Sequence, residues 1–485
     1  MLFTSFTFII FFICVFFVYY LIPQKYQWIW LLVSSLFFYM FTLPYAVIFL
    51  LFTACCAFFS GLLLARHKGI AKWSVLLILL PLLITKYWSF FNIHLERIIG
   101  YSVLPAINFI VPIGISFYTF ISIGYCIDVK RGAIEPERNF AKFLLYISYF
   151  PHIMQGPIDT VALSAELTKP KNFDYDNAVS GLKRVVIGFI KKIIIADRIG
   201  SLISFPNTEK GILVFWIVLL YSIQIYADFS AYMDIAIGCS KMLGINIAEN
   251  FNLPYFSKSI AEFWRRWHIT LGIWFKNYMY YPLLRSAICE KMRDFFKRKK
   301  NRYLMNTVPT ALVLFCIWFT IGFWHGAGFN YIAHGLFHGS IIILSLFLAP
   351  IYQILDKKIK GFISVKLVSI FCIIRTFLLV TFSYFFFWSG SLRKSITAIT
   401  NLFEGLYITD FITWFANNTG IIIPLGAAFM YFIYELIKYN KPVFNLENFT
   451  ASLPIVVKYG IYFLLIICII VFNDIESASF IYYKF

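Results

Sequence analysis

Long apolar stretches without a formally charged side chain dominate the pattern of hydrophobic and polar positions. Four of them lack Asp, Glu, Lys and Arg altogether: Met1 to Gln24, Tyr26 to Ala65, Ile98 to Ile127 and Tyr303 to Leu355. A bilayer core about 30 Å thick is crossed by roughly 20 apolar helical residues, so the second and fourth stretches are long enough for two spans each. With the shorter apolar segments added, the pattern predicts about ten to thirteen membrane segments. We therefore expect an all-α integral membrane protein.

Two regions depart from a simple succession of spans and loops. Asn177 to Arg198 alternates basic with branched apolar residues, which predicts an amphipathic, interfacial helix. Phe256 to Leu284 is rich in aromatic residues yet carries several charged ones. Such a segment either lies at the membrane interface or re-enters the protein, where its charges face a wet cavity and not lipid.

Composition supports the membrane assignment. Of 485 residues, 61% are hydrophobic and 13% are charged, whereas soluble domains carry about 25% charged residues. No change in composition and no flexible linker separates one part of the chain from another, so we expect a single polytopic membrane domain over residues 1–485. The expected location is a cell membrane, crossed many times.

The net charge of +19 does not indicate a nucleic-acid partner, because the basic residues lie in short loops between apolar stretches. That placement is typical of cytoplasmic loops under the positive-inside rule. The densest stretch, Arg285 to Arg302, fits a cytoplasmic loop on anionic lipid. The alternative is a contribution to binding a polyanionic donor such as coenzyme A.

His325 is the first candidate for chemistry. It precedes Gly326 and Gly328 inside the uncharged stretch from Tyr303 to Leu355, and the two glycines favour a helix break there. Broken backbone at membrane depth is tolerated only where it is buried in protein or lines a cavity. A histidine with a pKa near neutrality can take a proton from an attacking hydroxyl. The alternative is a packing histidine satisfied by a neighbouring helix.

His268 is the second candidate. At helical spacing it shares a face with Trp264, Trp267 and Leu271, while Arg265 and Arg266 point elsewhere. The alternative interpretation is an interfacial anchor of tryptophan and arginine.

Two carboxylates, Asp228 and Asp234, end another apolar stretch. A buried Asp costs several kcal/mol unless it is paired, and we expect Arg265 or Arg266 as partners. These aspartates are predicted to organise a cavity and not to perform acid/base chemistry. The nine cysteines are scattered without metal-ligand spacing, so neither a disulfide framework nor a metal site is predicted.

At these residues the sequence resembles the membrane-bound O-acyltransferase family, within it the branch of the alginate O-acetylation membrane protein. The segments that carry the resemblance are Val111 to Phe120, Phe150 to Ile158, Tyr226 to Asp234, Glu249 to Tyr255, Glu262 to Pro282 and Trp324-His325-Gly326. The most specific is the Phe-Trp-Arg-Arg-Trp-His core that ends at His268.

The resemblance implies a multi-helix bundle around a central funnel, with His325 as the catalytic residue at its waist and His268 as a second functional histidine. Trp324, Gly326, Arg265, Arg266 and Trp267 would shape the site. It also implies acetyl-coenzyme A as the donor substrate, with no bound cofactor. The acetyl group would cross the membrane to an extracytoplasmic partner of the SGNH-hydrolase type, which esterifies a polysaccharide.

The last residues, Ser479 to Phe485, resemble the aromatic ending of related acetylating proteins. We hypothesise that Tyr482 relays the acyl group to the partner, because a phenyl ester is activated for onward transfer. The alternative is an aromatic belt that anchors the last helix.

The function expected is therefore membrane O-acetyl transfer to an extracellular or cell-wall polysaccharide. One alternative uses the same fold to move D-alanine to teichoic acid. The other is a transporter whose intramembrane His, Asp and Arg residues line a permeation path, which composition alone fits equally well.

Overall fold

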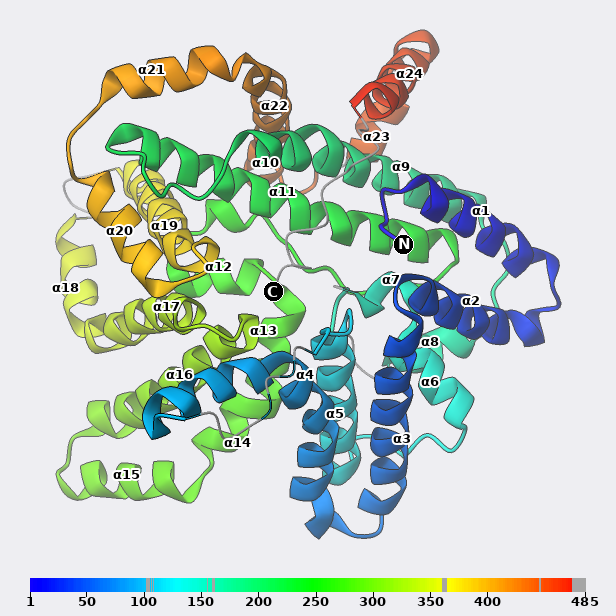
Figure 1. Ribbon diagram of the computed structural model, residues 1–485, viewed down its shortest axis with the longest axis horizontal. Helices are drawn as coiled ribbons and strands as arrows, with labels where there is room; N and C mark the ends of the chain where they lie inside the picture. Colours follow the sequence, from blue (N-terminus) through cyan, green and yellow to red (C-terminus); the bar gives the residue numbers. More distant parts are fainter. Residues whose placement is uncertain are drawn as a thin grey trace. The chain divides into compact units, whose positions relative to one another are not determined.

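The computed structural model describes residues 1–101, 105, 107, 109–154, 156–158, 162–359, 364–444 and 446–472. Over these residues the chain is helical, without a β-strand, which confirms the predicted all-α class (Figure 1). The chain divides into two compact units, and the helix α11 (Ile212–Met242) runs through both. The prediction of a single membrane domain stays a prediction.

Unit 1 comprises residues 1–197, 226–249 and the described part of 445–484. Besides the second part of α11 and a π-helix at Lys191–Asp197, its helices are α1 (Phe6–Leu21), α2 (Gln27–Thr42), α3 (Val47–Leu64), α4 (Ala71–Ile99), α5 (Ile115–Arg131), α6 (Phe140–Ser148), α7 (Phe150–Ile153), α8 (Ala162–Thr168), α9 (Tyr175–Ile190), α23 (Leu446–Ala451) and α24 (Ile455–Phe472).

Unit 2 comprises residues 198–225 and 250–444. Besides the first part of α11 and a π-helix at Lys276–Tyr280, its helices are α10 (Arg198–Leu202), α12 (Ile260–Arg266), α13 (Ile269–Phe275), α14 (Tyr281–Leu284), α15 (Ala287–Arg298), α16 (Arg302–His325), α17 (Phe329–Phe347), α18 (Ala349–Ile359), α19 (Val365–Trp388), α20 (Leu392–Leu402), α21 (Ile408–Asn417) and α22 (Ile422–Asn440).

Eight helices of the described residues are long and apolar enough to cross a membrane, against about ten to thirteen segments expected from hydropathy. The difference arises partly at the N-terminus, where α1 and α2 have only 16 residues each. The chain is thus a multi-pass membrane protein.

Helices α16 and α17 form a tight hairpin in unit 2, and Figure 1 shows them side by side in green and yellow-green. Glycines make the close approach possible, because a Cβ on Gly335 would lie 2.3 Å from the carbonyl oxygen of Trp318. A Cβ on Gly322 would lie 2.6 Å from that of Tyr331. Small residues at such crossings let membrane helices pack at short range. The hairpin places the short loop after His325 between two tightly packed helices.

Candidate functional site

The segment around His268 is not a continuous helix, contrary to the prediction that it shares a helical face with Trp264 and Trp267. Helix α12 ends at Arg266, and α13 begins at Ile269. Between them His268 has a left-handed backbone conformation with φ of 47°. The left-handed region is costly for a residue with a Cβ, on the order of 1–2 kcal/mol. The turn therefore needs support from outside the helices.

Asn250 supplies this support. Its carbonyl oxygen accepts from the backbone N–H of Ile269 at 3.0 Å, and its side-chain oxygen accepts from the backbone N–H and hydroxyl of Thr270 at 3.0 and 2.8 Å. Asn250 is fully buried. Our sequence reasoning gave it no role, although it lies within the quoted stretch from Glu249 to Tyr255.

Asn250 also orients the imidazole of His268. The Nδ1 atom lies 3.3 Å from the side-chain oxygen of Asn250, and since that oxygen only accepts, Nδ1 is the protonated nitrogen. Burial lowers the pKa of His268 from 6.5 to about 3. The ring is therefore neutral near pH 7, with Nε2 as its basic nitrogen.

His325 is the last residue of α16, which confirms the predicted break. Gly326 follows in an extended conformation, and a Cβ there would lie 2.2 Å from the ring of Tyr331. A side chain at this position would displace Tyr331, so the Trp-His-Gly sequence has a steric reason for its glycine. His325 itself is buried, with 4% of its surface exposed.

Both candidate histidines lie near the indole of Trp324. The ring centroid of Trp324 lies 4.8 Å from that of His325 and 6.3 Å from that of His268. Trp267, also buried, packs edge-on against Phe251 at 5.0 Å. Unit 2 therefore brings together His268, Trp267, Trp324 and His325, which lie on two segments far apart in the sequence.

Two further histidines extend this cluster. On α17, His334 lies 6.2 Å from His325 and 4.8 Å from His338, measured between ring centroids. Phe387 of α19 packs against both His325 and His334, at 5.2 and 5.1 Å. Our sequence reasoning assigned His334 and His338 no role. Their spacing of one helical turn within an uncharged stretch was the available signal.

Arg266 has its partners within unit 2, and the expected pairing of Arg265 or Arg266 with the aspartates of unit 1 stays a prediction. Arg266 donates to Glu262 one helical turn earlier, at 3.0 Å, and to the carbonyl oxygen of Asn252 at 3.3 Å. Arg265 is exposed. Both arginines follow each other directly before the buried turn, and their side chains are at least partly exposed.

Asp228 and Asp234 lie in unit 1, where they pair with residues of the stretch predicted to be an interfacial helix. Lys192 donates to Asp228 at 2.7 Å, and Lys191 donates to Asp234 at 2.7 Å. Arg184 adds a bond to Asp234 at 3.1 Å. Lys191 and Lys192 are buried, so this part of the stretch is internal and not interfacial.

The electrostatics of Lys192 follow from these pairs. Burial acts to lower its pKa, but the carboxylates of Asp228 and Asp197 outweigh it and raise the pKa above its ordinary value. The ammonium group therefore stays charged although only 1% of the side chain is exposed. The buried cluster is an ion-pair network that braces a π-helix.

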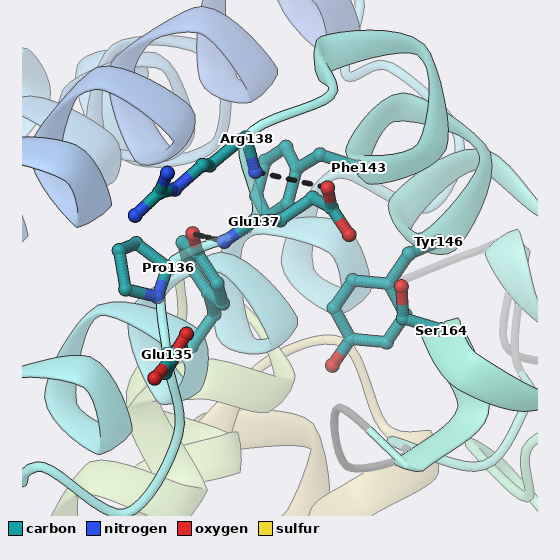
Figure 2. Close-up of a pocket in the computed structure, with 8 residues that line it drawn as sticks. Glu135, Pro136, Glu137, Arg138, Phe143, Tyr146 and Ser164 are labelled. Carbon is teal, nitrogen blue, oxygen red and sulfur yellow. Dashed lines mark hydrogen bonds between the residues drawn. The ribbon is translucent and has the colours of Figure 1, made fainter.

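A pocket of about 350 Å³ lies elsewhere in unit 1 (Figure 2). Figure 2 shows Glu135, Pro136 and Glu137 on the loop before α6, facing Tyr146 and Ser164. None of the residues predicted for the site lines this pocket. Tyr482, the hypothesised relay, lies outside the described residues.

Comparisons with known proteins match more than half of the chain. The model of the membrane-bound O-acyltransferase family matches residues 136–385. A probable alginate O-acetylase of Pseudomonas aeruginosa is 34% identical over 360 residues, which are 70% of this chain and 65% of that relative. The chain thus spans slightly less than two thirds of the length of this relative.

Two relatives of other substrate classes match as well. A teichoic acid D-alanyltransferase of Bacillus subtilis is 29% identical over 342 residues, 68% of this chain and 81% of that protein. A peptidoglycan O-acetyltransferase of Helicobacter pylori is 30% identical over 351 residues, 64% of this chain and 63% of that protein. The three names describe acetyl or D-alanyl transfer and mention alginate, teichoic acid and peptidoglycan.

Proposed function

Because this chain belongs to the membrane-bound O-acyltransferase family, we propose that it transfers acetyl groups from acetyl-coenzyme A for O-acetylation of an extracellular or cell-wall polysaccharide. The observation that carries the proposal is that two buried histidines, His268 and His325, both lie near the ring of Trp324. Family membership also favours acyl transfer over the transporter that composition left open.

In the proposed reaction His325 is the general base. It takes the proton of the attacking hydroxyl while the hydroxyl oxygen forms a bond to the thioester carbonyl carbon. The carbon–sulfur bond then breaks, and the proton passes from His325 to the departing thiolate. The products are the ester and coenzyme A with a free thiol, so no oxidant or cofactor is needed.

His268 is proposed as the second functional histidine. Its neutral ring is held by Asn250 with Nε2 basic, so it can accept a hydrogen bond from a substrate hydroxyl. Trp267, Trp324 and Gly326 give the site its shape, and Arg265 and Arg266 keep positive charge beside it. The predicted contribution of Asp228 and Asp234 to the cavity stays a prediction.

Transfer across the membrane completes the proposal. The donor approaches from the cytoplasmic side, and an extracytoplasmic partner of the SGNH-hydrolase type delivers the acetyl group to the polysaccharide. We propose that Tyr482 relays the group between the two. Mass spectrometry of the C-terminal peptide after incubation with acetyl-coenzyme A should detect the phenyl ester, and unimpaired transfer by Tyr482→Phe would refute the relay.

D-alanyl transfer to teichoic acid is the second candidate, supported by the match to the Bacillus subtilis protein over 68% of this chain. The two candidates differ in their donors, because D-alanine reaches its transferase on a carrier protein. Thioester cleavage should therefore be compared for acetyl-coenzyme A and for a D-alanyl carrier protein.

The test of the proposed function uses the purified chain in lipid nanodiscs with radiolabelled acetyl-coenzyme A. We expect His325→Ala to lower thioester cleavage by about 10²- to 10⁴-fold, the usual contribution of a general base. His67→Ala, which alters an exposed histidine, is the matched control and should retain native activity. Full activity in His325→Ala would remove the proposed mechanism.

A further inference from the structure

Three polar side chains form a seam along α17. Asn330, His334 and His338 are spaced four residues apart, so they lie on one face of the helix. All three bond to α19: Asn330 to the carbonyl oxygen of Phe386 at 3.1 Å, His334 to that of Ser383 at 3.1 Å, and His338 to the hydroxyl of Ser383 at 3.0 Å. Buried polar bonds of this kind hold membrane helices together.

The partners of the seam fix the tautomers of both histidines. A carbonyl oxygen only accepts, so Nδ1 of His334 carries the proton. The hydroxyl of Ser383 already donates to the carbonyl oxygen of Val380 at 2.6 Å. It therefore accepts from His338, whose Nε2 carries the proton. The basic nitrogen of His338 is Nδ1.

This Nδ1 atom is buried and has no hydrogen-bond partner within the described part of the chain. His338 as a whole is 1% exposed. A buried acceptor without a hydrogen bond is unfavourable, so a donor is expected beside it.

Trp264 of α12 is the complementary group. Its indole N–H is likewise buried without a partner among the described residues. The rings of Trp264 and His338 lie 5.1 Å apart between centroids, nearly perpendicular at 85°. A donor that lacks an acceptor thus packs against an acceptor that lacks a donor.

We propose that the Trp264 indole N–H donates to Nδ1 of His338 through one bound water, and that His338 is a positioning residue for acyl transfer. Trp264 lies four residues before His268, and His338 bonds to Ser383, which also holds His334 against His325. The link thereby ties the two functional histidines to one polar scaffold. Its kinetic consequence rests on the proposed function, whereas the link itself does not.

Nitrogen NMR of the purified chain labelled with ¹⁵N-histidine tests the link without any activity. The signals of His338 are those that His338→Gln removes. We expect the Nε2–H tautomer and a hydrogen-bonded Nδ1 whose signal shifts strongly in Trp264→Phe. Trp318→Phe is the matched control, because Trp318 also packs on His338, at 5.9 Å, and it should shift Nδ1 far less. An Nδ1–H tautomer, or equal shifts in both variants, would overturn the link.

A double-mutant cycle tests the positioning role. Trp264→Phe removes the donor and keeps a ring, while His338→Gln retains an amide N–H to donate to Ser383 but loses the Nδ1 atom. Each should lower kcat on the order of tenfold with little change in KM, as expected for displaced catalytic groups. The double variant should lose no more than either single one, because both remove the same bond. If the kcat losses of the two single variants multiply in the double variant, the positioning role is refuted, even where the NMR supports the link.

Discussion

At the scale of single residues, His268 combines an unfavourable backbone with a buried titratable ring. Its φ of 47° and its 1% exposure are both sustained by Asn250. Strained residues of this kind persist only where the surroundings hold them, and they gather at functional sites. Because the ring must stay neutral to remain buried, protonation opposes folding.

This gives a prediction of stability against pH. The pKa of His268 is lowered by burial to about 3 in the folded chain, against about 6.5 when unfolded. Between these values the unfolded chain binds more protons at this residue, so the contribution of His268 to stability is constant above about pH 6.5 and falls as the pH drops towards 3. Thermal unfolding midpoints of the purified protein should show this decline, and His268→Gln should reduce its slope.

His67→Gln is the matched control for this measurement, since it removes an exposed imidazole. It should leave the slope as in the native chain. His152 is a second contributor, because burial lowers its pKa to about 4. A slope that His268→Gln leaves unchanged would contradict the assignment to His268.

The two candidate histidines differ in how far sequence could predict them. The break after His325 follows from Gly326 and Gly328, which are adjacent residues with a local effect. The turn at His268 depends on Asn250, which lies 18 residues earlier and bonds only in the folded chain. Helical periodicity therefore predicted a helical face shared by Trp264 and His268, which does not form because the helix ends at Arg266.

At the scale of secondary structure elements, the π-helix Lys191–Asp197 shows how burial reverses a charge pattern. Alternating basic and apolar residues are typical of an interfacial helix. Here Lys191 and Lys192 instead point inward, because Asp234 and Asp228 of α11 offer carboxylates at 2.7 Å. The lysines lie in the π-helix and the two aspartates in α11, so the sequence of neither segment alone predicts these ion pairs.

The network predicts an asymmetric response to mutation. Lys192→Met leaves the carboxylate of Asp228, 2% exposed, without its cation, and should cost about 3–5 kcal/mol. Asp228→Asn should cost less, because Lys192 keeps Asp197 at 2.7 Å. The double variant should be more stable than Lys192→Met, since only the more exposed Asp197, 17% accessible, then lacks the lysine.

Unfolding in detergent, followed by the midpoint of heat denaturation, checks these three variants. Lys210→Met is the matched control, because it breaks the exposed pair with Glu404, in which 44% of each side chain is accessible. Exposed pairs contribute little, so its midpoint should equal that of the native chain. A double variant as unstable as Lys192→Met would show that the buried charge is not the cause.

At the scale of the whole molecule, the family match covers residues 136–385, which include His268 and His325 together with Asn250 and Ser383. Apolar length predicted the membrane class, since the requirement for about 20 residues per span holds for any sequence. The ion pairs and the polar seam arise from contacts between distant segments, and no local pattern encodes them.

The placement of basic residues gives the last prediction, the orientation of the chain in its membrane. The connection from α15 to α16 holds Lys299 and Lys300, and Arg302 opens α16 directly after it. Short basic loops stay in the cytoplasm. A cysteine at the exposed position Lys299 should therefore react with a membrane-impermeant maleimide in inside-out vesicles and not in intact cells. The unmutated chain corrects for its nine native cysteines. Labelling in intact cells would place this loop outside, and a cytoplasmic donor would then have to reach His325 from the opposite face.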